Sequence, residues 1–134
     1  MTSRALGILR WLPACLWMGA IFWMSSLPGG AGGRFSTLAH MVEFAILAAL
    51  LLWPLWERGP YLAGALTVLA ASVYGALDEV HQFFVPGRVA DPVDWLFDTL
   101  GAIAAAAVLV ALCASRAKRT GRTPEDGSPG ARAR

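Results

Sequence analysis

The residues of this chain that could do acid–base chemistry are concentrated in one run, DEVHQFFVPGRVADPVDWLFD, at positions 78–98. The run holds five carboxylates, one histidine and one arginine. Carboxylates and imidazoles are the side chains that most often exchange protons with a substrate, and a guanidinium binds anionic groups through paired hydrogen bonds. We therefore expect this run to contribute to a site that binds or transforms a charged ligand.

Two further polar residues, His40 and Glu43, are about 60° apart on a helix and so share one of its faces. The candidate acid–base residues are Asp78, Glu79, His81, Asp98, His40 and Glu43. The candidate substrate-binding residues are Arg88, Gln82, Asp94 and Ser26. Two of the charged side chains also have simpler interpretations. Asp91 before Pro92 is typical of a helix N-cap that Asp94 can complete, and Arg88 can bind a lipid phosphate.

The sequence predicts no cofactor and no metal. The alternative is a divalent ion bound by His40, His81 and two carboxylates, but HxxE and ExH on different helices are a weak signal without HExxH or a cysteine cluster. No nucleophile stands out, because neither of the serines at positions 25 and 26 has an assignable base. Cys15 and Cys113 are far apart in apolar surroundings, and we expect packed free thiols.

Long apolar runs must position these residues. Hydrophobic residues make up 57% of the 134 residues, charged residues 15%, and the mean hydropathy is +0.55. A membrane-spanning helix needs about 20 apolar residues. Four runs qualify, separated by breaks rich in Gly or Pro: residues 8–27, 37–56, 61–84 and 93–114. We predict an all-α membrane protein with four transmembrane helices. For the first run a signal peptide is the alternative, because Arg4 and Arg10 precede or begin it.

The basic residues predict which way the spans face. If the N-terminus is cytoplasmic, seven of the basic residues up to position 122 lie inside and only Arg34 and Arg88 lie outside. The seven are Arg4, Arg10, Arg58, Arg116, Lys118, Arg119 and Arg122. We therefore expect a membrane domain over residues 1–114, both termini in the cytoplasm, and a disordered basic tail over residues 115–134. This topology explains the basic tail, so we expect no nucleic-acid partner.

This topology places every candidate residue at the extracytoplasmic end of its span. Tyr74, Asp78, His81 and Gln82 share an arc of about 100° on the third span. Asp94, Asp98 and Gly101 share about 80° on the fourth. We expect these stripes and the His40 face to converge on one pocket. Ionisable groups within a membrane cost several kcal/mol to bury, which favours a functional site.

Three segments resemble the VanZ-like family of small bacterial membrane proteins: SSLP (25–28), LAHMVEFAIL (38–47) and DEVHQFFVPGR…D…D..G (78–101). The resemblance covers residues from about 17 to 105. It implies an integral protein of the bacterial cytoplasmic membrane, associated with resistance to glycopeptides such as teicoplanin, and no established reaction. The chain departs from the family at Thr37, where Lys is common, at Phe44, where an aromatic hydroxyl is common, and at Asp98, where Asn is usual. These departures remove phosphate-binding and phenolic groups and make the site more acidic.

Three functions remain open. In the first, the polar site recognises or acts on a membrane-lipid headgroup, a cell-wall lipid precursor or a lipoglycopeptide antibiotic. In the second, the protein is an acid–base or metal-dependent enzyme of the outer leaflet, with Glu79 or Asp78 as general base and His81 or His40 as partner, while Arg88 holds an anionic group. In the third, it is a subunit of an ion-coupled transporter. A path through the apolar inner halves would then need an oligomer, and the sequence predicts no oligomeric state.

Overall fold

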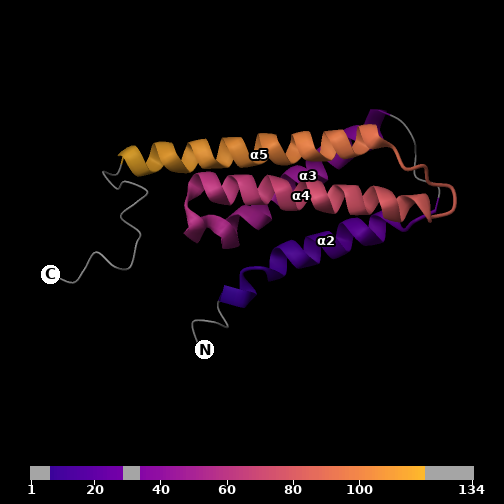
Figure 1. The fold of residues 1–134 in the computed structure, drawn as a ribbon, viewed down its shortest axis with the longest axis horizontal. Helices are drawn as coiled ribbons and strands as arrows, with labels where there is room; N and C mark the ends of the chain where they lie inside the picture. The colour runs from indigo at the N-terminus through magenta and orange to yellow at the C-terminus, as the bar shows by residue number, and fades with distance from the viewer. Residues whose placement is uncertain (1–6, 29–33, 120–134) are drawn as a thin grey trace.

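A computed structural model describes residues 7–28 and 34–119 of the chain. Long helices run side by side and alternate in direction (Figure 1). The elements are α2 (Leu12–Ser25), α3 (Arg34–Leu55), the short 3-10 helix η1 (Trp56–Arg58), α4 (Pro60–Phe83) and α5 (Pro92–Arg119). No strand is present among the described residues. The predicted all-α architecture is therefore confirmed.

Four of these helical segments are long and apolar enough to cross a membrane: Gly7–Ser25, Thr37–Arg58, Pro60–Phe83 and Pro92–Arg116. Large apolar side chains cover the outside of the bundle; Leu16, Leu69 and Val108 are 66%, 61% and 57% exposed. Such a surface would be costly in water, whereas lipid tails are as apolar as the side chains. The protein is thus a multi-pass membrane protein. α2 belongs to the bundle, because its Ala14 and Ile21 are buried in the common core.

Small residues let the helices pack closely. The core combines the large Phe44 and Leu47 of α3 with Ala71 of α4 and Ala102 of α5. At Gly101 of α5 the two backbones meet, since an added Cβ would lie only 2.2 Å from the carbonyl oxygen of Met41. Close backbone approach at small residues is typical of packing between membrane helices. The contact brings the beginning of α5 next to the beginning of α3.

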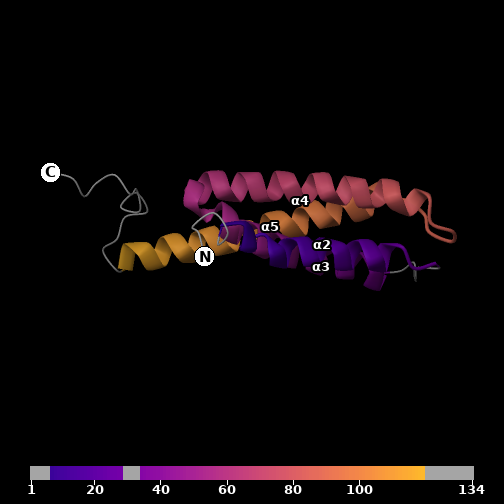
Figure 2. The same cartoon turned by 90° about the horizontal axis from the view of Figure 1, so that it is seen from below.

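The connection between α4 and α5 forms one end of the bundle, seen at the right of Figure 1. Gly87 in this connection has φ +80°, which suits glycine. Asp91 caps α5 as predicted, because its Oδ1 accepts a hydrogen bond of 2.8 Å from the backbone N–H of Val93. α2 begins and α5 ends at the opposite end, which also carries η1 (Figures 1 and 2). One end of the helical bundle therefore carries the α4–α5 connection, and the other carries η1.

Two expectations need correction. α5 continues to Arg119, so the helix passes the predicted boundary at residue 114, and residues 120–134 of the predicted tail lie outside the described residues. Cys15 and Cys113 are free, as expected, but both are exposed on the outer surface and not packed inside. Both thiols have apolar neighbours in the sequence because they lie on a lipid-facing helix surface. The sequence pattern alone does not distinguish such a surface from a buried core.

Candidate functional site

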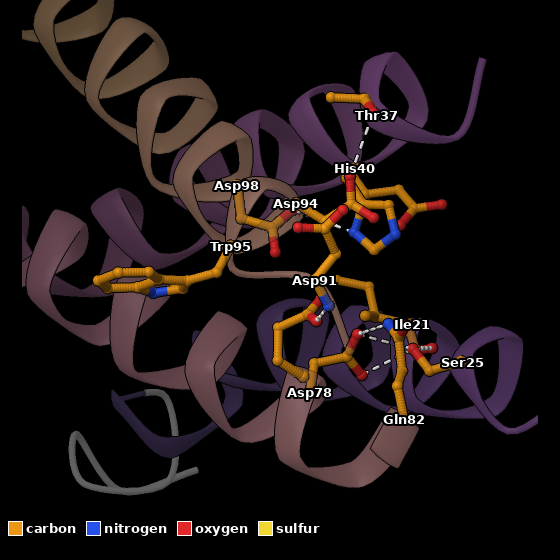
Figure 3. Close-up of polar contacts among 12 residues, drawn as sticks. Ile21, Ser25, Thr37, His40, Asp78, Gln82, Asp91, Asp94, Trp95 and Asp98 are labelled. Atoms are coloured by element: carbon orange, nitrogen blue, oxygen red, sulfur yellow. Dashed lines mark hydrogen bonds and ion pairs between the residues drawn. The ribbon is translucent and has the colours of Figure 1, made fainter. Parts of the chain in front are cut away.

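Polar side chains from all four long helices meet at the end of the bundle that carries the α4–α5 connection (Figure 3). They form two groups, where the sequence predicted one pocket. The α3-side cluster comprises Thr37, His40, Glu79, Asp94 and Asp98. The α2-side cluster comprises Ser25, Ser26, Asp78, His81 and Gln82. No hydrogen bond joins the two groups among the described residues. The reason lies on α4, where Asp78 and Glu79 are successive residues and point to different neighbouring helices.

A buried pair, His40 and Asp98, forms the centre of the α3-side cluster. Nδ1 of His40 lies 3.2 Å from Oδ1 of Asp98, and the residues are 7% and 0% exposed. Figure 3 shows the two side chains directed toward each other from α3 and α5. Glu79 of α4 is also buried, and His40, Glu79 and Asp98 each offer one metal-ligating atom within 4.8 Å of the others. Three predicted residues on three helices are therefore brought together.

Two carboxylate oxygens in this cluster accept no hydrogen bond from any described residue. They are Oε1 of Glu79 and Oδ2 of Asp98, both shielded from solvent. Oε2 of Glu79 accepts a hydrogen bond of 2.6 Å from the backbone N–H of Asp91. A buried polar atom without a partner costs about 1–3 kcal/mol, and more when it is charged. The protein groups described around these two oxygens therefore do not offset the cost of burying them.

Asp94, a candidate substrate-binding residue, does not complete the cap of α5 that was its simpler interpretation. Glu79 accepts the hydrogen bond from the backbone N–H of Asp91 instead. The carboxylate of Asp94 accepts a hydrogen bond of 3.1 Å from the hydroxyl of Thr37. Asp94 therefore links α5 to α3 at the edge of the cluster.

Asp78 holds α2 against α4. The hydroxyl of Ser25 lies 2.6 Å and 2.8 Å from its two oxygens, and Nε2 of Gln82 donates to Oδ2 at 2.8 Å. All three residues are buried. The hydroxyl of Ser25 also lies 2.9 Å from the carbonyl oxygen of Ile21, so its single proton serves one acceptor at a time. Because both Asp78 oxygens have partners, this carboxylate is a structural link between α2 and α4.

His81 contacts the end of α2. Its Nε2 lies 2.9 Å from the hydroxyl of Ser26, and its ring stacks on Phe22 with a centroid distance of 4.3 Å. The expectation that neither serine has an assignable base is therefore wrong, because Ser26 lies beside His81 and Ser25 beside the Asp78 carboxylate. The hydroxyl of Ser26 also donates to the carbonyl oxygen of Phe22 at 2.7 Å. His81 does not belong to the group of described residues that could share one metal ion, so the alternative that combined His40 with His81 gains no support.

Arg88 and Glu43 lie outside both clusters. Arg88 donates from Nη2 to the carbonyl of Met24 at 2.8 Å and from Nε to the carbonyl of Leu27 at 3.3 Å. A cation suits the carbonyl end of a helix, so Arg88 caps α2. Glu43 is half-buried, and within the described residues its carboxylate forms no hydrogen bond, although its backbone carbonyl accepts one from Trp17.

Sequence reasoning missed the partners of several site residues. Ser25 and Thr37 were not among the candidates, and each binds a carboxylate more than 50 positions away. Helix phase identifies which face of one helix is polar, but it does not pair faces of different helices. The only signal in the sequence was proximity to a candidate: Ser25 is next to Ser26, and Thr37 is one helical turn before His40.

The fold and the site define a class: a four-span helical membrane protein with ionisable side chains buried at one end of its bundle. Within that class, the VanZ/LLP1 family model matches residues 29–113, more than half of the chain, and the protein belongs to this family. No curated protein and no solved structure matches the chain. The matched stretch includes every member of the α3-side cluster, whereas Ser25 and Ser26 of the α2-side cluster precede it.

Proposed function

We propose that this protein recognises a lipid-anchored ligand with a polar, anionic head at the extracytoplasmic face of the bacterial cytoplasmic membrane. One observation carries the proposal. His40, Asp78, Glu79 and Asp98 are all buried at the same end of helices long enough to span a membrane. Burial of each ionised group costs several kcal/mol, and a four-helix bundle can fold without any buried ionised group. A ligand-binding role gives a reason for this cost.

The basic residues support the extracytoplasmic orientation. Arg10, Arg58 and Arg116 belong to helical segments that end or begin away from the α4–α5 connection. Such residues favour the cytoplasmic side of a membrane. The polar clusters would then face the outer leaflet, where phospholipid headgroups, lipid-linked cell-wall precursors and lipoglycopeptide antibiotics are all present.

The half-buried groups at this end suit an anionic head. Ser26, His81 and Arg88 are all partly accessible, and each can donate a hydrogen bond. Arg88 is already oriented by the carbonyls of α2, so it presents a fixed positive charge. Hydrogen bonds to a charged group contribute about 1.5–3 kcal/mol each, equivalent to roughly 10–100-fold in affinity.

A binding experiment tests the proposal with the full chain in nanodiscs. Phosphatidylglycerol, a lipid-linked cell-wall precursor and teicoplanin serve as three separate ligands. Ser26→Ala and His81→Phe should each weaken binding of the true ligand by about 10-fold. Ser115→Ala is the matched control, because its hydroxyl is exposed on α5 and bonds only the carbonyl of Ala111. Absence of binding for all three ligands, or equal losses in Ser26→Ala and Ser115→Ala, would overturn the proposal.

An acid–base enzyme of the outer leaflet is a second candidate, favoured by the bond between His40 and Asp98. A carboxylate that holds one imidazole nitrogen orients the ring and leaves the other nitrogen for proton transfer. Incubation of the same three ligands with the protein, followed by mass spectrometry of the products, separates turnover from binding.

An ion-coupled transporter is supported less well. A through-path needs polar groups in both halves of the bundle. Thr67 is the one polar residue that is fully buried and without a hydrogen bond in the part of α4 distant from the two clusters. A single hydroxyl offers no ionisable step for a proton or cation.

A further inference from the structure

We infer that His40, Glu79 and Asp98 form a binding site for one divalent transition-metal ion, with Zn²⁺ and Mn²⁺ as the ions that suit these ligands. The inference concerns a metal site and does not depend on the identity of any lipid ligand. It replaces the sequence expectation of no metal, and it also replaces the alternative that combined His40 with His81.

The positions of the three side chains fit a single ion. Their ligand atoms all lie within 4.8 Å of one another, and they come from α3, α4 and α5. An ion that binds nitrogen and oxygen at about 2.0–2.2 Å places neighbouring ligand atoms roughly 3.0–3.5 Å apart. Nδ1 of His40 and Oδ1 of Asp98 already have this spacing, at 3.2 Å.

Unpartnered oxygens point to a missing cation. Glu79 is 8% exposed and Asp98 is fully buried, yet Oε1 of Glu79 and Oδ2 of Asp98 accept no hydrogen bond in the described part of the chain. A metal ion is an electron-pair acceptor that satisfies such oxygens without a protein donor. The second oxygen of Glu79 is held by the backbone N–H of Asp91 at 2.6 Å, which orients the carboxylate as outer-shell contacts do in metal sites.

The local charge favours the same conclusion. The cluster contains two buried carboxylates and one imidazole, so a neutral imidazole leaves a net negative site. Among the described basic side chains, Arg88 is bonded to carbonyls of α2, and Arg10 pairs with Glu57 of η1. With a neutral imidazole, burial of the two carboxylates inside a membrane bundle costs several kcal/mol each. A divalent ion neutralises both.

The ligand types restrict which ion fits. Imidazole suits Zn, Fe, Ni and Cu, whereas Mg²⁺ and Ca²⁺ prefer sites built from oxygen alone. One nitrogen and two carboxylates are compatible with Zn²⁺ and, among harder ions, Mn²⁺. Three protein ligands leave at least one coordination position open, which is the arrangement of sites that also bind an external ligand.

Metal titration tests the inference on the full chain in detergent. The protein is stripped with a chelator, loaded with Zn²⁺ or Mn²⁺, and its bound metal is measured by elemental mass spectrometry. About one equivalent is expected for the unmodified chain, and the conservative changes Glu79→Gln and Asp98→Asn should each weaken binding by at least about 100-fold. Glu57→Gln is the matched control, since this carboxylate belongs to η1 at the opposite end of the bundle and pairs with Arg10. It should bind as the unmodified chain does.

Two results would overturn the inference: less than about a tenth of an equivalent of metal after loading, or equal losses in Glu57→Gln and Glu79→Gln. The first would indicate that Glu79 and Asp98 instead share protons. If either site variant fails to fold, Co²⁺ on the unmodified chain gives a second measurement, because its visible absorption reports nitrogen and oxygen ligation. His81→Gln must leave that spectrum unchanged. Lipid binding is measured separately, so failure here leaves the lipid proposal standing.

Discussion

The imidazole of His40 and the carboxylate of Asp98 lie 3.2 Å apart across α3 and α5, although 58 positions separate them in the chain. Gly101, one turn further along α5, touches the backbone of Met41, the residue after His40. The polar contact and the closest backbone contact therefore occur side by side. The geometry of the buried pair depends on how closely these two helices approach.

His40 and Asp98 should stabilise the fold as a pair. We expect His40→Ala and Asp98→Ala each to lower the free energy of unfolding by about 1–3 kcal/mol, because each leaves a buried polar partner unpaired. The double variant should cost less than the sum of the two, by about 0.5–3 kcal/mol. Denaturant unfolding in micelles with a chelator present measures all three. Simple additivity would mean that the pair contributes no interaction energy.

Gly101→Ala should loosen the α3–α5 contact. The added methyl would lie 2.2 Å from the carbonyl oxygen of Met41, which belongs to a backbone that cannot rotate away. Overpacking of this kind costs about 1–3 kcal/mol. Gly19→Ala is the control, because nothing lies within 4 Å of its added methyl. Thermal unfolding of the two variants in the same detergent should show a loss for Gly101→Ala alone; equal midpoints would contradict the close approach.

Ser25→Ala should weaken the attachment of α2. The change removes a buried donor from Asp78 and leaves that carboxylate with Gln82 alone. We expect a loss of about 1–3 kcal/mol in the free energy of unfolding. Ser26→Ala should cost less, since its hydroxyl is half-buried and bonds the backbone of its own helix. Unfolding midpoints compare the two directly, and a larger effect at Ser26 would argue against Asp78 as the link.

Reporter fusions should show which way the bundle faces. Alkaline phosphatase fused after Arg88 should be active, because this connection is expected outside the cytoplasm. The same enzyme fused after Arg58 should be inactive, and a fluorescent protein at that position should mature. The reverse pattern would place the polar clusters in the cytoplasm and overturn the outer-leaflet part of the proposed function.

The sequence was sufficient for the fold because each span is a long apolar run between Gly- or Pro-rich breaks. It also identified His40, Glu79 and Asp98, because an ionisable residue in such a run is conspicuous. The cap at Asp91 was predicted correctly for a similar reason: it depends only on neighbouring residues. Local signals of this kind require no knowledge of how the helices pack.

Partner choice between helices was less predictable. Asp78 and Glu79 are successive residues, and their separation into different clusters follows from the position of α4 between α2 and α5. The role of Arg88 was missed because its acceptors are backbone carbonyls, which leave no trace in side-chain composition. The exposure of Cys15 was misjudged because lipid-facing and buried positions have the same apolar neighbours.

The long separation between His40 and Asp98 has a consequence for biogenesis. At about 5–20 residues per second, the ribosome needs roughly 3–12 s to add the 58 positions between them. During that interval α3 has been synthesised with an ionisable group whose partner does not yet exist. Membrane insertion of α3 must therefore rely on the apolar remainder of the helix, or wait for α5. The last span is then the step that commits the earlier ones to their final positions, and truncation before it should expose α3 to quality-control proteolysis.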